Sequence, residues 1–353
     1  MAADLSSTAH GKPGILMVNL GSPDAAETKA VRKFLFQFLH DKRVIDTSRW
    51  IWCPILHFVI LRVRPAKSAK AYSKIWHLPE GAGEAPESWA DKESPLVRIT
   101  RAQVKGVQER LGGSAHVEVA MRYGNPSIAD AIDRLKEKGC TRIGVLPLYP
   151  QFAGATTASI YDGVAKALTK RMDVPELRYV RDYYRDPRFI AALGEGLKSH
   201  LAKLDWTPDV VMTSYHGLPQ SYVDKGDPYQ DECIVTTDLL RDYMGMSAHE
   251  MQTTFQSRFG PKAWLQPYTD KMLEAMPAEG VKKVAVMMPG FSADCLETLE
   301  EIAMEAHEIF EEHGGEKFTA VPCLNDDAAH LDFLADLVRE KLLTGWTSEV
   351  VNA

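Results

Sequence analysis

One histidine of this sequence stands where a side chain can take protons or hold a metal. His216 follows an apolar segment, and Gly217 and Pro219 behind it make the chain turn. Histidine suits both kinds of chemistry, because free imidazole titrates at about pH 6.5 and each ring nitrogen can bind a proton or a metal. A strand-end histidine that only bonds a nearby carbonyl would show the same pattern. The residues therefore leave a reactive and a structural interpretation open.

A line of carboxylates near the C-terminal end is the second candidate group. Asp294, Glu297 and Glu301 begin a series at spacings of three and four, which predicts one acidic face on a helix from about Asp294 to His313. Stacked like charges raise one another's pKa, which suits groups that pass protons or hard cations. The pair Asp294-x-x-Glu297 also resembles a capping box worth about 1 kcal/mol, and the residues alone favour that interpretation. The later members, Glu305, Glu308 and Glu312, are typical of a solvated face.

Short apolar segments that alternate with helical patterns must position these groups. Near-continuous apolar runs of this kind are typical of parallel strands covered on both faces. The clearest of them are Gly14–Leu20, Val117–Tyr123, Arg142–Leu148, Asp209–Tyr215 and Lys283–Met288. One helix is expected from near Ser127 to just before Gly139. With 353 residues the chain has room for two open parallel sheets, and we expect the break between them near Val180–Pro187.

The residues that follow these five segments share a character. Each is a turn-permissive or polar stretch, and in parallel sheets such stretches gather at the carboxyl ends of the strands, where ligands bind. They are Gly21-Ser22-Pro23, Arg122-Tyr123-Gly124, Tyr149-Pro150-Gln151, His216-Gly217-Leu218-Pro219 and Pro289-Gly290-Phe291-Ser292. The sequence therefore predicts a crevice formed by these strand ends.

Composition excludes several classes of protein. Acidic residues outnumber basic ones by 48 to 41, which argues against nucleic acid as the main partner. The five cysteines form no C-x-x-C pair, so a disulfide framework or zinc ribbon is not expected. The start of the sequence has no apolar signal core, so a cytoplasmic enzyme is expected.

The longest apolar run is Trp50–Leu61, preceded by Phe34, Phe36, Phe38 and Leu39 and followed by four basic residues, Arg62, Arg64, Lys67 and Lys70. As a helix the run would span only ~18 Å, too short for the ~30 Å hydrocarbon core of a bilayer. Its composition fits an interfacial segment, the lip of an apolar pocket or a core helix of the first domain.

Taken together, six ordered motifs resemble the ferrochelatase family. They are ILMVNLGSP, MRYGNPSI, LPLYPQFAGATTAS, SYHGLPQSYVDKGDPY, TFQSRFGPKAWLQPYTD and PGFSADCLETLEEI. The match extends from Gly14 to about Leu342. The resemblance implies an enzyme that inserts Fe(II) into a porphyrin and releases two protons, in a cleft between two Rossmann-like domains. We expect these domains at 13–180 and 181–345, each a parallel β-sheet flanked by helices.

The resemblance also implies roles for particular residues. His216 matches the histidine that accepts pyrrole protons or binds iron, and Glu297 matches the carboxylate on the opposite wall. Asp294 and Glu301 match the acidic path that leads away from it. The residues that match positions around the macrocycle are Leu20, Arg122, Tyr123, Tyr149 and Trp264. The segment 34–61 matches the apolar lip through which porphyrin enters, often against the inner face of a membrane.

Three departures from the family pattern refine these expectations. Cys295 replaces the second histidine of animal members, so no role of that histidine transfers. Gly154 replaces a cysteine that holds an iron–sulfur cluster in animal members, and the C-terminal tail carries no cysteine, so no [2Fe-2S] cluster or other resident cofactor is expected. Leu20 stands where relatives that use coproporphyrin tend to carry tyrosine. This favours protoporphyrin IX, with haem as the product.

Three other functions remain open. Coproporphyrin III or another divalent metal would be an alternative substrate of the same enzyme. A non-catalytic carrier of tetrapyrrole or metal would bind porphyrin without turnover. A hydrolase that pairs His216 with a serine is disfavoured because the sequence has no G-x-S-x-G motif.

Overall fold

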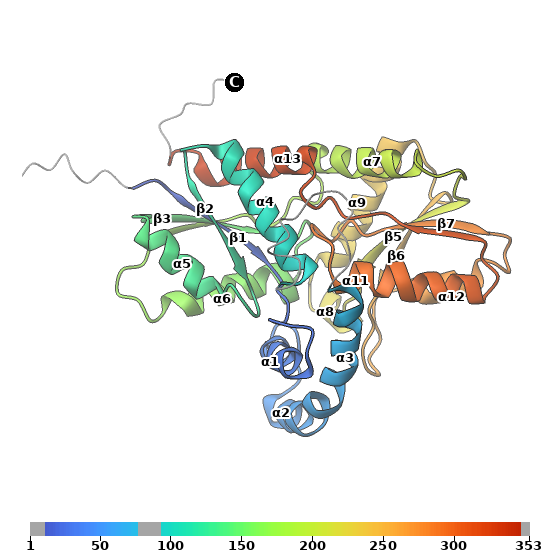
Figure 1. Cartoon of the computed structure of the whole chain (residues 1–353), viewed down its shortest axis with the longest axis horizontal. Helices are drawn as coiled ribbons and strands as arrows, with labels where there is room; N and C mark the ends of the chain where they lie inside the picture. Colours follow the sequence, from blue (N-terminus) through green and yellow to red (C-terminus); the bar gives the residue numbers. More distant parts are fainter. Residues whose placement is uncertain (1–10, 77–92, 347–353) are drawn as a thin grey trace, which may run out of the picture.

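A computed structural model describes residues 11–76 and 93–346 of the chain. Two parallel four-stranded sheets lie side by side in it (Figure 1). The first has the order β2-β1-β3-β4 and contains β1 (Gly14–Asn19), β2 (His116–Met121), β3 (Arg142–Pro147) and β4 (Glu176–Tyr179). The second has the order β6-β5-β7-β8 and contains β5 (Val210–His216), β6 (Met251–Gln256), β7 (Lys283–Met287) and β8 (Lys317–Ala320). The predicted α/β fold with two parallel sheets is confirmed.

The five predicted strands are present with ends shifted by one or two residues. All six residues of β1 are buried, as expected for a central strand with helices on both faces. The other three strands had no clear sequence signal. β4 and β8 have four residues each and lie at sheet edges, and β6 reads MQTTFQ, with more polar than apolar side chains.

Helices connect the strands of both sheets. In the first half they are α1 (Thr28–Leu39), α2 (Arg49–Ile55), the π-helix η2 (Leu56–Ile60), α3 (Leu61–Ile75), α4 (Pro95–Leu111), α5 (Ile128–Glu137), the π-helix η3 (Gly154–Ala158) and α6 (Ser159–Leu168). In the second half they are α7 (Pro187–Leu201), α8 (Gln220–Val223), α9 (Tyr229–Met244), α10 (Thr269–Ala275), α11 (Leu296–Leu299), the π-helix η4 (Glu301–Ala306), α12 (His307–Glu312), α13 (Ala328–Val338) and the π-helix η5 (Arg339–Leu343). Helix α5 confirms the helix predicted after Ser127, whose Oγ accepts a hydrogen bond from the amide of Asp130.

The helices α1 to α3 project from the two sheets as a separate unit (Figure 1). The apolar run Trp50–Leu61 corresponds to α2, η2 and the first residue of α3. Among residues 11–76 and 93–346, no helix is long and apolar enough to cross a membrane.

The last helix returns to the first sheet. Helix α13 packs on α4, and η5 packs against β3 and β4. A Cβ at Gly106 of α4 would lie 2.4 Å from Leu331, and one at Gly144 of β3 would lie 2.9 Å from Leu342, so glycine permits both contacts. One apolar core therefore joins both halves of the chain. The limits 13–180 and 181–345 of two separate domains stay a prediction.

Candidate active site

The carboxyl ends of the strands from both sheets meet at one place. Gly290 follows β7, and a Cβ placed there would lie 3.3 Å from Tyr215 of β5 and 3.5 Å from Gln151, which follows β3. Gln103 of α4 also reaches the other half, where its Nε2 donates to the main-chain oxygen of Ser292 at 2.8 Å. The predicted crevice between strand ends therefore lies between the two sheets.

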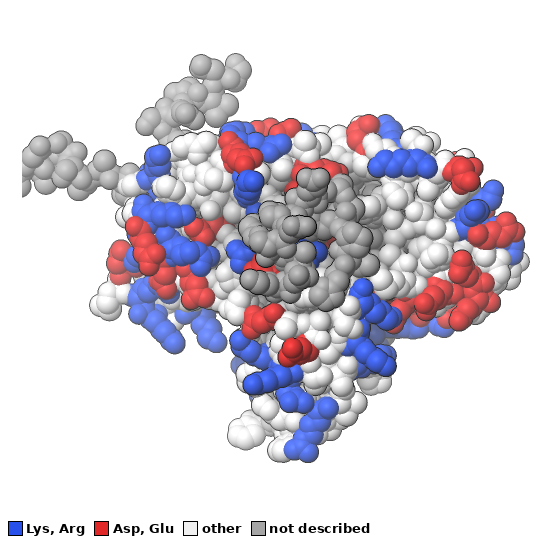
Figure 2. Space-filling model, in the orientation of Figure 1, with Lys and Arg blue, Asp and Glu red and all other residues white. Residues whose placement is uncertain are grey.

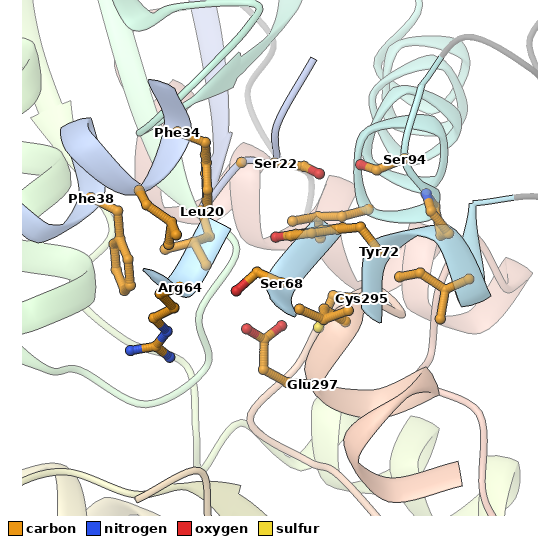
Figure 3. Close-up of a pocket in the computed structure, with 16 residues that line it drawn as sticks. Leu20, Ser22, Phe34, Phe38, Arg64, Ser68, Tyr72, Ser94, Cys295 and Glu297 are labelled. Atoms are coloured by element: carbon orange, nitrogen blue, oxygen red, sulfur yellow. The ribbon is translucent and has the colours of Figure 1, made fainter. Parts of the chain in front are cut away.

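A cavity of about 610 Å³, measured with its open mouth, lies beside these strand ends (Figure 3). Its apolar walls come mainly from α1, α3, the loop after β1 and the start of α4, and its polar wall includes the start of α11. The lining residues are Leu20, Gly21, Ser22, Phe34, Leu35, Phe38, Arg64, Ser68, Tyr72, Ile75, Ser94, Pro95, Leu96, Cys295, Leu296 and Glu297. Leu20 and Glu297 are thus the two sequence-predicted site residues that line it directly.

Glu297 enters the cavity from the first turn of α11 (Figure 3). The predicted capping box Asp294-x-x-Glu297 is wrong, because the N-cap of the helix is one residue later than expected. Cys295 is the N-cap, and its amide donates to Thr298 Oγ1 at 3.0 Å while its side chain accepts from the amide of Thr298. The capping box therefore does not use the carboxylate of Glu297, which lines the cavity.

Asp294 lies outside the cavity and holds the start of this helix. The side chain is buried, and its two carboxylate oxygens accept hydrogen bonds from Thr298 Oγ1 at 2.9 Å and from Asn325 Nδ2 at 2.7 Å. The amide of Cys323 donates to the same carboxylate at 3.3 Å. The structure does not bring Asp294 together with the carboxylates of Glu297 and Glu301, and its role in an ion path stays a prediction.

The expectation of one acidic helix face is also wrong. The segment Glu301–Ala306 is a π-helix, in which the amide of Glu305 bonds the carbonyl of Glu300 five residues earlier at 2.9 Å. This wider turn breaks the spacing of three and four. Glu300 points away from the site and pairs with Lys74 of α3 at 2.7 Å. Glu301 instead points towards the strand ends, where its carboxylate accepts a hydrogen bond from Ser257 Oγ.

Electrostatics links Glu301 to both His216 and Glu297. Burial raises the pKa of the Glu301 carboxyl above its ordinary value. The hydrogen bond from Ser257 and the charge of His216 lower this pKa, whereas the charge of Glu297 raises it. His216, Glu297 and Glu301 are therefore close enough for their charges to interact.

His216 ends β5 with one ring nitrogen engaged. Its Nδ1 lies 2.8 Å from the main-chain oxygen of Gly217, and a proton on Nδ1 leaves Nε2 as the basic nitrogen. Gly217 is packed tightly, since a Cβ there would lie 2.8 Å from the main-chain oxygen of Gln256 and 3.3 Å from the ring of Trp264. The structure therefore places Trp264 beside the turn that follows His216.

Arg122 and Tyr123 belong to a hydrogen-bonded cluster around Asp41. The Tyr123 hydroxyl and Ser159 Oγ both donate to Asp41 Oδ2, at 2.8 Å and 2.6 Å. Arg122 pairs with the same carboxylate and donates from Nε to the main-chain oxygen of Ser159 at 2.7 Å. Burial alone would raise the pKa of Asp41, but these hydrogen bonds hold it below its ordinary value.

Tyr149 stands next to this cluster. Burial raises its pKa well above the ordinary value, with smaller contributions from the neighbouring Tyr123, Cys295 and Glu297. Its hydroxyl oxygen is buried and has no hydrogen-bond partner among the residues that the structure describes. Tyr149 therefore lies near the cavity wall that carries Glu297, although it does not line the cavity itself.

Sequence reasoning did not identify the cavity residues of α3. Arg64, Ser68 and Tyr72 are spaced by four, which places them on one helix face, and this spacing was the available signal. Arg64 packs over the ring of Phe259 at 4.5 Å. Burial lowers its pKa, and the charge of Glu297 opposes that shift. Within the described part of the chain no carboxylate lies within ion-pair distance of Arg64, so Glu297 acts on this cavity-lining cation only at longer range.

The described residues contain no group of three or more His, Cys, Asp or Glu side chains arranged to hold a metal ion. All five cysteines are unpaired thiols, and only Cys53 is partly exposed.

Comparisons with known proteins identify a family and related sequences for this chain. A family model described as ferrochelatase matches residues 12–342. The ferrochelatase of Rhodopseudomonas palustris is 50% identical over 335 residues, which cover 94% of this chain and 94% of the relative. The ferrochelatase of Rhizobium meliloti is 49% identical over 339 residues and 96% of both chains.

Solved structures show the same fold at low identity. SirB from Bacillus subtilis with Fe3+ has a TM-score of 0.56 and 12% identity, and the match covers 95% of this chain and 97% of that one. The sirohydrochlorin chelatase SirB in complex with cobalt has a TM-score of 0.52 and 13% identity, with coverage of 94% and 95%. The two-sheet architecture is thus shared with known chelatases.

Proposed function

The chain belongs to the ferrochelatase family, and we propose that the porphyrin into which it inserts Fe(II) is protoporphyrin IX. As a ferrochelatase it is a lyase of haem biosynthesis, with a porphyrin and Fe(II) as substrates. The observation that carries the assignment of the site is the position of Glu297. Its carboxylate enters an apolar cavity, and its charge acts on the same buried Glu301 as the charge of His216.

The walls of the cavity support a porphyrin with few carboxylates. Phe34, Leu35, Phe38, Ile75 and Leu96 supply apolar surface for the macrocycle and its uncharged substituents. Arg64 is the one Lys or Arg side chain among the described residues that line the cavity, and it suits one propionate. Protoporphyrin IX carries two propionates and coproporphyrin III carries four. Burial of additional unpaired carboxylates in this cavity would be costly, which favours protoporphyrin IX.

Insertion of Fe(II) requires that two pyrrole protons leave the ring. We assign their acceptance to the Nε2 atom of His216, which the Nδ1 contact with Gly217 leaves basic. Glu297 acts from the helix side, where a carboxylate can bind Fe(II) as it loses water and passes to the ring nitrogens. An incomplete ligand set suits this step, because a tight site would retain the metal.

In this proposal Glu301 accepts a proton that the reaction releases. Its pKa is raised by burial, so it can take up and release a proton closer to neutral pH than an exposed carboxyl can. Its contact with Ser257 holds it beside the strand that carries Gln256, next to the turn after His216. The proposed proton route therefore runs from His216 to Glu301.

Side-by-side assays of two porphyrins test the proposal. The purified chain is mixed under anaerobic conditions with Fe(II) and either protoporphyrin IX or coproporphyrin III, and metalloporphyrin is followed by absorbance. We expect a higher kcat/KM with protoporphyrin IX. A preference for coproporphyrin III would contradict the substrate, and stoichiometric porphyrin binding without turnover would favour a carrier.

We also propose that the chain has no iron–sulfur cluster. Gly154 offers no side chain, and its amide donates to Asp227 Oδ2 at 2.7 Å, so this position is occupied by an internal contact. An assay that finds two irons and two sulfides per purified chain would overturn this proposal.

A second proposal concerns the projecting unit of α1 to α3. We propose that the enzyme acts in the cytoplasm with this unit in peripheral contact with an anionic membrane surface. Trp50 is 91% exposed, Val63 72% and Phe58 66%, which is unusual for large apolar side chains. Figure 2 shows Lys and Arg side chains around the end of the molecule where Figure 1 places α2 and α3. Apolar insertion together with basic residues is the usual composition of an interfacial segment.

Vesicle sedimentation tests this contact. The wild-type chain and the variant Trp50→Ser/Phe58→Ser are compared on vesicles of phosphatidylcholine with and without phosphatidylglycerol. We expect the wild type to sediment with anionic vesicles and the variant to stay in the supernatant. Equal sedimentation of both proteins would contradict the proposal.

A further inference from the structure

Gln256, the last residue of β6, makes one hydrogen bond towards each wall of the site. Its main-chain oxygen accepts from the amide of Gly217, directly after His216, at 2.7 Å. Its side-chain Nε2 donates to the main-chain oxygen of Glu297 at 2.8 Å. One residue therefore joins the strand of His216 to the helix that carries Glu297.

The amide of Gln256 is held in one orientation. The side chain is buried, and its Oε1 accepts from Ser214 Oγ at 2.9 Å. Ser214 continues a buried chain of hydroxyls through Thr269, at 2.8 Å, to Thr254, a further 2.9 Å away. The carbonyl of Glu297 can only accept, so rotation of the amide would place Oε1 against that oxygen and break the bond, whereas the hydroxyl of Ser214 can bond either end of the amide.

The helix that receives this bond is too short to fix its own direction. α11 has only four residues and is followed at once by the wider turn of η4, so its internal hydrogen bonds fix its direction poorly. The neighbouring Ser257 adds a second tie, because its Oγ donates to the carboxylate of Glu301. Ser257 does so with a φ of +63°, in the left-handed region that residues with side chains rarely adopt.

We infer that Gln256 is a positioning residue of the chelatase reaction, which fixes the carboxylate of Glu297 relative to His216. Gln256 touches neither porphyrin nor metal in this role; it acts through the main chain of both walls, and its side chain also bonds that of Glu301. The inference rests on the proposed roles of these two residues. It predicts that loss of the amide harms the metal-dependent step and leaves porphyrin binding intact, since Gln256 does not line the cavity.

Two variants of Gln256 and one matched control test the inference. Gln256→Met keeps the length of the side chain and removes both polar contacts. Gln252→Met makes the same change on the same strand, where Nε2 bonds the carbonyl of His249 at 3.1 Å, away from the cavity. We expect Gln256→Met to lower kcat and kcat/KM for Fe(II) by about 10- to 100-fold, as for the loss of other supports of metal ligands. The Kd for protoporphyrin IX without metal, measured by fluorescence quenching, should stay within about twofold of wild type, and Gln252→Met should match wild type in both.

The pH–rate profile of Gln256→Glu distinguishes a positioning role from a merely structural one, which would leave the profile unchanged. The new carboxylate keeps an acceptor for Ser214 but places negative charge beside the carbonyl of Glu297 and near Glu301. We expect a similar loss of turnover and an acid limb of the pH–rate profile that moves to higher pH, because the added charge raises the pKa of Glu301 further. This variant also decides the case if Gln256→Met does not fold.

The outcomes separate this inference from the proposed function. Gln256 variants that behave like Gln252→Met, or that weaken porphyrin binding as much as turnover, would overturn the positioning role while wild-type turnover upholds the function. A wild-type chain that binds protoporphyrin IX without turnover would remove the proposed function, and the inference with it.

Discussion

Replacement of Glu297 by glutamine separates the catalytic role of this residue from its structural one. The change removes one charge and keeps the shape of the side chain. Because the cap of α11 is formed by Cys295 and Thr298, the variant leaves the capping box intact. A carboxylate in the first turn of a helix is worth about 0.3–1 kcal/mol through the helix dipole, and the relief of repulsion with Glu301 offsets part of that loss. We therefore expect a change of less than about 1 kcal/mol in the free energy of unfolding, or a few degrees in Tm.

The expected effect on turnover is much larger. A positioned acid–base group contributes about 10²- to 10⁴-fold to a rate, equivalent to about 3–5 kcal/mol in the activation free energy. The assay measures kcat and KM for anaerobic insertion of Fe(II), together with Tm. Loss of the Glu297 charge also lowers the pKa of Glu301, so the acid limb of the remaining activity should move to lower pH. Glu308→Gln, at an exposed position further along the helix, is the control and should match wild type.

One combination of results would contradict a catalytic role of Glu297. If Glu297→Gln retained kcat within about threefold of wild type and mainly lost Tm, the residue would be structural and the proposed site would lose one wall.

Three further predictions concern His216, Arg64 and His330. His216→Ala should abolish haem formation and leave far-UV circular dichroism unchanged; turnover near that of wild type would contradict the assignment of the proton acceptor. Arg64→Leu should raise KM for protoporphyrin IX by at least about tenfold, as expected for loss of a charged hydrogen bond worth about 1.5–3 kcal/mol. Arg62→Leu, at an exposed position, is the control and should leave KM unchanged. Equal effects of the two variants would argue against a propionate contact. Complete burial lowers the pKa of His330 to about 4, so as the pH falls below ~6.5 the unfolded chain binds a proton at this residue and the folded chain does not. The free energy of unfolding, measured with urea, should therefore decrease by up to about 3 kcal/mol as the pH falls from ~6.5 to about 4. His330→Asn, which keeps a donor for the carbonyl of Asn325, should reduce this decrease.

Some features of the site followed from residue order alone. A buried parallel strand must be apolar along its length, so β1, β3 and β5 were predictable from local composition, and the rule that ligands gather at carboxyl ends then placed His216 at a crevice. The motifs likewise identified Glu297 as the partner of His216. The charges of His216 and Glu297 both act on the pKa of Glu301, which agrees with that pairing. The catalytic roles of the three residues stay predictions.

Other features depended on contacts between distant segments. The strand β6 has a polar sequence because Thr254 and Gln256 are satisfied by a buried hydroxyl chain from Ser214 and Thr269, which no local pattern reveals. The acidic series was expected to form one face, but the π-turn of η4 sends Glu300 to Lys74 and Glu301 to Ser257. Asp294 matched a cap by spacing, yet Asn325 and Cys323, about 30 residues further along, determine where its carboxylate lies.

The sequence by itself therefore determined which residues are candidates for the chemistry, because residue type and strand-end position are local properties. The tertiary structure decided how these residues face one another. A helix of four residues has no fixed direction of its own, so the orientation of Glu297 depends on Gln256, on Asp294 and on the cavity wall of α3.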